Sequence, residues 1–204
     1  MKIIKTVLIT ILVITIASCT KKEEKVIPLY EIKKDAMIPE INKDSVLAFL
    51  QAQVDMGPRD PNSAAHLEAK SYFIRTLEKY ADKVVRQDFT YPAPDKTLNL
   101  TNIIAVFNPA AKNRIILGAH WDSRPWSDQD PDPANREKPI LGANDGASGT
   151  AILIEIARIL SLQKPEYGID IVLFDGEDYG HHDDLDNYCI GSKYFAAVKD
   201  RDYS

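Results

Sequence analysis

The sequence contains few cysteines, few histidines and no cluster of basic residues. Only 2 of its 204 residues are cysteine, only 4 are histidine, and the formal net charge is −5. Two cysteines cannot form a disulfide framework, so the fold must be stabilised by a hydrophobic core, for which the chain is long enough. Proteins that bind nucleic acid carry clustered lysine and arginine, and that class is therefore excluded.

The apolar run at residues 7–17 is shorter than the ~20 residues that a membrane-spanning helix needs. Two lysines, Lys2 and Lys5, precede this run, and Cys19 follows it. A basic start, a short apolar stretch and small residues at its end are typical of a secretory signal. With its cysteine, the segment resembles a bacterial lipoprotein signal, in which cleavage occurs before the cysteine and the cysteine carries a lipid. A single membrane helix is the alternative.

This interpretation of the N-terminus divides the chain into three parts. Residues 1–18 are expected to be a lipoprotein signal peptide, residues 19–39 a charged tether, and residues 40–204 one folded domain. The protein would then be attached to a membrane through Cys19 in the cell envelope, on the periplasmic face or at the cell surface. Cys189 would be the one cysteine left to the domain, and it is expected to be a small buried residue.

Hydrophobic periodicity predicts alternating helices and strands. The first predicted segments are two helices and two strands, at residues 46–54, 65–80, 84–91 and 98–107. Two short apolar runs, 114–119 and 169–174, are typical of buried strands. The segment 147–162 between them is apolar almost all round, with Glu155, Arg158 and Leu162 as a narrow exposed stripe. A strand, a buried helix and a strand predict a parallel βαβ unit in an α/β domain.

Three polar clusters are predicted to lie together at one edge of this sheet. Their sequences are GAHWDSRPW (118–126), LGANDGASG (141–149) and FDGEDYGHH (174–182). Ligands of such sheets bind outside the carboxyl ends of the strands. Each cluster alone has a simpler explanation, since Asn-Asp-Gly is typical of a turn or helix cap and an acidic loop is usually a solvated surface. Their common placement favours a metal site.

The carboxylates and the imidazole in these clusters suit a zinc ion. A zinc ion that polarises a carbonyl is held by such ligands and keeps one position open. Asp145 and Asp178 are the candidate ligands. Glu177 would face the substrate as a general base and acid, because adjacent residues of an extended stretch point to opposite sides. His120 and Asp122 are expected on one side of the chain for the same reason.

These motifs resemble those of the bacterial glutaminyl cyclases, which are zinc enzymes with the fold of the co-catalytic zinc aminopeptidases. The resemblance rests on GAHWDSRPWSDQDPD, PILGANDGASGTAILIEIARIL, IDIVLFDGEDYG and YCIGSKYFA. It implies a three-layer α/β/α fold with a mixed, largely parallel sheet. It also implies that Asp145 and Asp178 bind the metal and that Glu177 is the acid and base. His120 matches a ligand of the second metal in two-zinc aminopeptidases, and in one-zinc cyclases it lies beside the ion.

The resemblance further implies a reaction on peptides with an N-terminal glutamine. Zinc would polarise the γ-carbonyl, and Glu177 would take a proton from the attacking α-amine and return it to the departing ammonia. Trp121 and Trp126 are expected to help form the substrate pocket, and His181 and His182 to belong to a variable loop. Two alternatives stay open, namely a two-zinc aminopeptidase and a lipid-anchored binding protein without turnover.

One departure from the resemblance concerns the end of the chain. The family pattern continues well past Ser204, and its third zinc ligand is a histidine from that later region. His66 is a poor substitute, because it is expected on a helix that is far from the strand ends in sequence. We therefore expect the chain to be an incomplete part of the fold with little activity. Neither the substrate sequence nor an oligomeric state follows from the residues.

Overall fold

The computed structural model describes residues 39–181 and 184–198, so the predicted signal peptide, Cys19 and nearly all of the tether lie outside the described residues. The described helices and strands are α2 (Lys43–Asp55), α3 (Ala64–Leu77), β1 (Lys83–Pro92), β2 (Thr97–Phe107), β3 (Arg114–His120), α4 (Gly149–Leu162), β4 (Gly168–Phe174) and α5 (Ile190–Ala197). Three short helical turns are η1 (Pro133–Asn135), η2 (Ala143–Ser148) and η3 (Leu185–Asn187). Each predicted segment is present close to its expected bounds. In this part of the chain no helix is both long and apolar enough to cross a membrane.

The four strands form one mixed sheet in the order β1-β2-β4-β3. β1 and β2 form an antiparallel hairpin, β2 also pairs antiparallel with β4, and β3 pairs parallel with β4. The mixed sheet is confirmed, although parallel pairing among the described strands is limited to β3 and β4. The short connection between β1 and β2 can join only antiparallel neighbours, because a parallel pair needs a long crossover such as α4.

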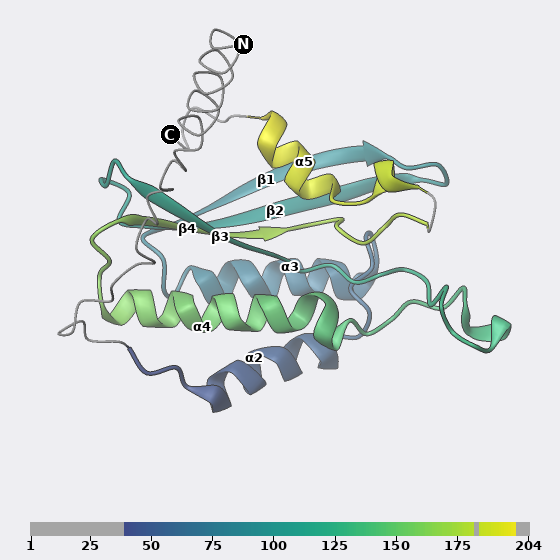
Figure 1. Cartoon of the computed structure of the whole chain (residues 1–204), viewed down its shortest axis with the longest axis horizontal. Helices are drawn as coiled ribbons and strands as arrows, with labels where there is room; N and C mark the ends of the chain where they lie inside the picture. The colour runs from purple at the N-terminus through teal and green to yellow at the C-terminus, as the bar shows by residue number, and fades with distance from the viewer. Residues whose placement is uncertain (1–38, 182–183, 199–204) are drawn as a thin grey trace, which may run out of the picture. The chain divides into compact units, whose positions relative to one another are not determined.

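Helices cover both faces of this sheet (Figure 1). α2, α3 and α4 lie on one face and α5 lies on the other, which gives the three layers that were expected. The main core lies between the sheet and the helices α3 and α4, and includes Phe73, Leu77, Ile103, Trp121, Ile154, Ile171 and Leu173. A smaller apolar group on the other face includes Phe195 of α5. β2 and β4 are buried on both faces, which explains their nearly continuous apolar sequences.

Helix α4 is enclosed more completely than its sequence predicts. The expected exposed stripe is wrong for Glu155, which is 1% exposed. Its carboxylate accepts the backbone N–H of Asn42, just before α2, at 2.8 Å and pairs with Arg158 at 2.6 Å. A buried carboxylate needs such partners. Periodicity within α4 could not reveal this, because the helix that covers Glu155 comes from a distant part of the chain.

Candidate active site

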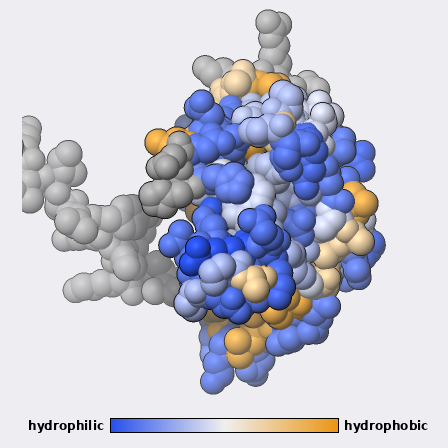
Figure 2. Space-filling view, turned by 90° about the vertical axis from the view of Figure 1, so that its right-hand side faces the viewer, coloured by the Kyte–Doolittle hydropathy of each residue, from blue (hydrophilic) through white to orange (hydrophobic). Residues whose placement is uncertain are grey.

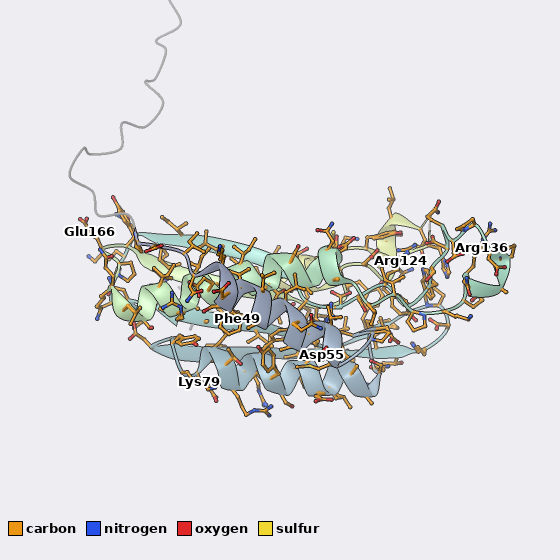
Figure 3. All side chains as sticks on the ribbon, turned by 90° about the horizontal axis from the view of Figure 1, so that it is seen from below. Phe49, Asp55, Lys79, Arg124, Arg136 and Glu166 are labelled. Atoms are coloured by element: carbon orange, nitrogen blue, oxygen red, sulfur yellow. The ribbon has the colours of Figure 1, made fainter. Side chains whose placement is uncertain are left out.

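Three loops meet at the end of the domain where β3 and β4 finish. Arg124, which follows β3, lies at the opposite end of the domain from Glu166, which precedes β4 (Figure 3). The turn η2 lies at the same end as Arg124, because it leads into the start of α4 (Figure 1). Figure 2 faces this end and shows mainly hydrophilic residues. The predicted convergence of the three polar clusters is therefore present in the structure.

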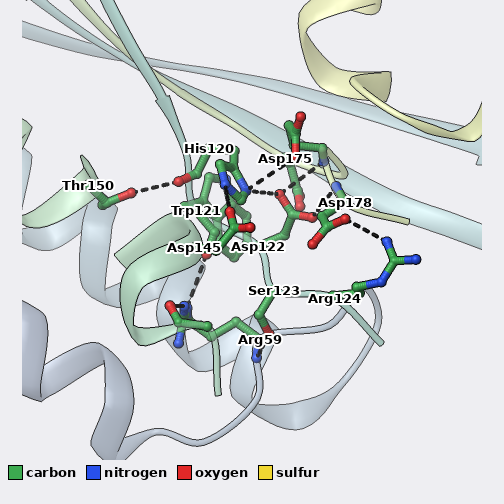
Figure 4. Close-up of polar contacts among 12 residues, drawn as sticks. Arg59, His120, Trp121, Asp122, Ser123, Arg124, Asp145, Thr150, Asp175 and Asp178 are labelled. Carbon is green, nitrogen blue, oxygen red and sulfur yellow. Dashed lines mark hydrogen bonds and ion pairs between the residues drawn. The ribbon is translucent and has the colours of Figure 1, made fainter. Parts of the chain in front are cut away.

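The first contact within the site joins His120 to Asp145 (Figure 4). His120 is the last residue of β3, and its Nε2 lies 2.7 Å from Oδ1 of Asp145 in η2. The turn approaches the strand so closely that a Cβ on Gly146 would lie 2.5 Å from the His120 carbonyl oxygen. Only glycine fits there without a shift of the backbone. The Thr150 hydroxyl at the start of α4 also donates to that carbonyl, at 2.9 Å, so η2 and α4 together hold His120 in place.

Asp122 anchors the third loop. Its side chain is completely buried, and its two oxygens accept the backbone N–H groups of Glu177 at 3.0 Å and of Asp178 at 3.3 Å. Asp122 Oδ1 also lies 3.4 Å from His120 Nδ1. Burial raises the pKa of Asp122, but His120 and the two amide donors outweigh burial, so the pKa is lowered and the carboxylate stays ionised. The prediction that His120 and Asp122 share one side of the chain is confirmed.

Glu177 and Asp178 are adjacent in sequence but face different partners. Glu177 Oε2 lies 4.0 Å from His120 Nδ1, and the Cys189 thiol donates to Glu177 Oε1 at 3.3 Å. Asp178 Oδ1 accepts a hydrogen bond from Arg124 Nη1 at 2.6 Å. Burial raises the pKa of Asp178 to about 6, against the opposing effect of Arg124. The structure thus places the two carboxylates in different surroundings, and only Asp178 of the two lines the adjacent pocket.

A pocket with a volume of about 700 Å³ opens beside Asp145 and Asp178. Its lining consists of Asp145 and Asp178 together with Arg124, Trp126, Ser127, Asp128, Gln129, Asp130, Ile140, Leu185 and Tyr188. Trp126 is therefore a wall residue of this pocket. The expectation for Trp121 is wrong. Trp121 is completely buried in the main core, because its indole N–H donates to the Thr101 carbonyl and its ring packs among the apolar residues beneath the sheet.

His66 lies much closer to the site than its position in the sequence predicts. It projects from the first turn of α3, is 1% exposed, and places Nε2 2.9 Å from Oδ1 of Asp175, the first residue after β4. Its ring stacks on Trp121 with a centroid distance of 4.4 Å. The Thr101 N–H donates to the second oxygen of Asp175 at 2.6 Å. This buried pair joins α3 to the loop that carries Glu177, and it belongs to the support of the site.

Arg59 is a second supporting residue that sequence analysis did not identify. It is completely buried, and its guanidinium donates to the carbonyl oxygens of Trp121, Leu141 and Gly142 at 2.9–3.0 Å. Burial lowers the pKa of Arg59, and the charge of Asp122 opposes that effect. Arg59 therefore ties the segment before Asp145 to the end of β3. Its only signal in the sequence is an arginine in the Gly-Pro-Arg segment at 57–59, where a solvated side chain is the ordinary expectation.

The donors at this edge suit a zinc ion in their chemistry. His120, Asp145 and Asp178 provide an imidazole and two carboxylates, which are ligand types that zinc binds, and His120 already meets Asp145. Within residues 39–181 and 184–198, no group of three histidine, cysteine, aspartate or glutamate side chains is arranged to hold an ion. Among the described residues, the groups suited to zinc are thus two carboxylates that line one pocket, with His120 beside them. They do not form a complete set of ligands around one point.

A pH effect on stability follows from the surroundings of His120. Burial alone would lower its pKa, but the carboxylates of Asp122, Glu177 and Asp145 outweigh burial and raise the pKa to about 9. Because an unfolded histidine has a pKa of about 6.5, the contribution of His120 to the free energy of unfolding is complete below that pH and is lost as pH rises through 9. We expect urea unfolding of the metal-free protein to show this decline in stability. His120→Gln should abolish the decline, and an equal decline in that variant would contradict the assignment.

Comparison with known proteins identifies the family and the solved structures that this chain resembles. Residues 102–204 match the family described as Peptidase family M28. The glutaminyl cyclase structure of Bacteroides thetaiotaomicron, bound to N-acetylhistamine, is 42% identical and has a TM-score of 0.77, over 80% of this chain and 58% of that one. The structure of a Zn-dependent exopeptidase of Parabacteroides distasonis is 41% identical with a TM-score of 0.78, over the same two shares. The chain is also 27% identical to the glutaminyl-peptide cyclotransferase of Bos taurus, over 68% of this chain and 40% of that protein. The chain thus spans less than two thirds of the length of each of these relatives.

Proposed function

We propose that this chain, which belongs to peptidase family M28, acts as a zinc-dependent glutaminyl-peptide cyclotransferase. Such an enzyme converts an N-terminal glutamine to pyroglutamate and releases ammonia. The observation that carries the proposal is the similarity to a solved glutaminyl cyclase over most of the described domain. The pair of carboxylates at the end of β4, one beside His120 and one in the pocket, supports it.

Glu177 is proposed as the group that moves the proton. The α-amine nitrogen of the substrate forms a bond to the γ-carbonyl carbon, the bond from that carbon to the amide nitrogen breaks, and Glu177 carries the proton from the attacking amine to the departing ammonia. The backbone N–H of Glu177 donates to Asp122 and holds the loop, and the Cys189 thiol donates to the Glu177 carboxylate. A positioned acid and base of this kind contributes about 10²–10⁴-fold to a rate.

Asp145 and Asp178 are proposed to hold the zinc ion, with His120 beside them. A zinc ion held there would supply Lewis-acid polarisation of the γ-carbonyl. The apolar part of the pocket, formed by Trp126, Ile140 and Leu185, would enclose the glutamine side chain. Displacement of water by the bound glutamine side chain would favour attack by the amine of the substrate over hydrolysis.

The products of one assay test this proposal. The full-length protein, loaded with zinc, is incubated with a peptide that begins with glutamine, and ammonia and the free first residue are both measured. We expect ammonia and a pyroglutamyl peptide. Release of the free first residue instead would identify an aminopeptidase, and the absence of both products in a zinc-loaded protein would favour a binding protein without turnover.

The location of the protein is proposed from its N-terminal sequence, which lies outside the described residues. We infer a lipid-anchored protein of the cell envelope, because Cys19 ends an apolar segment of the lipoprotein type. We expect Cys19→Ala to accumulate as an unlipidated precursor when cells are labelled with a radioactive fatty acid. Cys189→Ala is the matched control and should be labelled normally. Persistent labelling of the Cys19 variant would contradict lipidation at this residue.

A further inference from the structure

Arg124 has an unusual set of contacts between the pocket and the carboxylates of the site. Its Nη1 donates to Asp178 Oδ1 at 2.6 Å and to the Tyr188 hydroxyl at 3.0 Å. Its Nε and Nη2 donate to the two oxygens of Asp128 at 3.0 and 2.7 Å. The guanidinium also lies over the rings of Tyr188 and Trp126, at 5.6 and 6.0 Å from their centroids. All three of its nitrogens are therefore engaged.

We propose that Arg124 is a positioning residue for Asp178. It holds Oδ1 of that carboxylate, so that Oδ2 would be the oxygen through which Asp178 would bind the metal ion. The inference rests on the proposed function, in which Asp178 is a zinc ligand. Carboxylate ligands of metal ions are commonly oriented by hydrogen bonds from residues behind them, and such partners matter nearly as much as the ligands.

The burial of this pair distinguishes it from an ordinary surface ion pair. The side chains of Arg124 and Asp178 are only 12% and 13% exposed. Exposed ion pairs stabilise proteins little, because water screens them and long side chains lose freedom when they are held. Arg124 is instead fixed in advance by the two-pronged contact with Asp128, which lies four residues further along the same loop. Arg124 therefore has an anchor besides Asp178, which a group that orients another needs.

The chemistry of the contacts requires arginine at this position. The planar guanidinium presents its N–H donors in a fixed fork, so that one edge can grip Asp128 while another N–H reaches Asp178. A lysine ammonium has the same charge but cannot satisfy both carboxylates with this geometry. Arg124→Lys keeps the positive charge and removes the planar guanidinium, so this variant tests the two contributions separately.

Zinc affinity tests the inference without any measurement of turnover. The full-length protein and its variants are titrated with zinc against a chelator of known affinity. We expect Arg124→Met to weaken zinc binding by about 10–100-fold, the range seen when supporting residues of metal ligands are removed. Arg124→Lys should also weaken it, by a smaller factor, because the charge remains and the fork is lost.

Arg114 provides a matched control at the other end of the sheet. It is the first residue of β3, and it grips Asp170 with two nitrogens in a pair that is similarly buried. Arg114→Lys loses the same kind of fork and should leave zinc affinity unchanged, even if the protein becomes less stable. A thermal denaturation midpoint for each variant separates lost stability from lost affinity.

Several outcomes would overturn the inference. Zinc affinity of Arg124→Met within about threefold of the unaltered protein would show that Asp178 needs no such support, and tighter binding would show that the guanidinium competes with the ion. Failure of the unaltered protein to bind zinc would overturn both this inference and the proposed function. If the Arg124 variants weaken zinc binding as expected but the unaltered protein releases no ammonia from glutamine peptides, only the proposed function is refuted.

Discussion

Glu177→Gln is expected to keep its zinc and lose at least about 10²-fold in ammonia release from a glutamine peptide. The amide has nearly the same shape as the carboxylate, and the backbone N–H that holds residue 177 to Asp122 is untouched, so the loop should keep its position. What disappears is a carboxylate that can accept a proton from the substrate amine. Zinc content by elemental analysis and turnover on the same sample are the two measurements.

Two companion variants make this result interpretable. Asp145→Ala should lose zinc as well as turnover, because a proposed ligand is removed. Glu166→Gln makes the same chemical change in an exposed residue at the opposite end of the domain and should change neither quantity (Figure 3). A Glu177→Gln protein that is free of zinc would reverse the roles assigned to Glu177 and Asp178.

Asp122→Asn is expected to damage both stability and turnover. Its two oxygens accept the N–H groups of Glu177 and Asp178, and an asparagine side chain would turn an NH₂ group towards one of these donors. A buried donor without a partner costs about 1–3 kcal/mol, so the free energy of unfolding should fall by that amount. Because the same two residues carry the proposed chemistry, turnover should fall further than the population of folded protein explains.

Urea unfolding and turnover at a temperature where the variant is fully folded check this expectation. Asp88→Asn is a suitable control, because Asp88 lies on β1 with a half-exposed side chain that pairs with Arg86 at 3.4 Å. Asp88 also accepts the Thr101 hydroxyl at 2.7 Å, and an asparagine keeps an oxygen for that hydrogen bond. Surface substitutions of that kind usually change stability by less than about 0.5 kcal/mol. Equal stability of the Asp122 variant and the control would show that Asp122 does not hold the loop.

The sequence predicted the architecture well because each strand and helix carries its own periodic signal. β3, α4 and β4 are short apolar segments separated by polar clusters, and the βαβ arrangement follows from them. The placement of His120, Asp122, Asp145, Glu177 and Asp178 at one edge followed from the same rule about strand ends. These predictions needed only local pattern and one topological rule.

The supporting residues could not be predicted, because their partners come from distant segments. His66 meets Asp175 across 109 residues of sequence, and Arg59 meets Gly142 across 83. Neither contact leaves a periodic trace, since a buried histidine or arginine looks the same in sequence as an exposed one. Trp121 was misjudged for a different reason. The alternation that puts its neighbours His120 and Asp122 on the side of the site directs its own ring into the core.

The parallel register of β3 and β4 has a consequence for the order of folding. His120 is paired with Phe174, so the three loops of the site meet only after the chain has closed a crossover that contains α4. Contacts so distant in sequence form late, because loop-closure entropy must first be overcome. The β1 and β2 hairpin depends on local contacts and can form earlier. In a hydrogen-exchange experiment during refolding, the amides of that hairpin should therefore become protected before those of Glu177 and Asp178. The sheet would then form before the residues of the site are brought together.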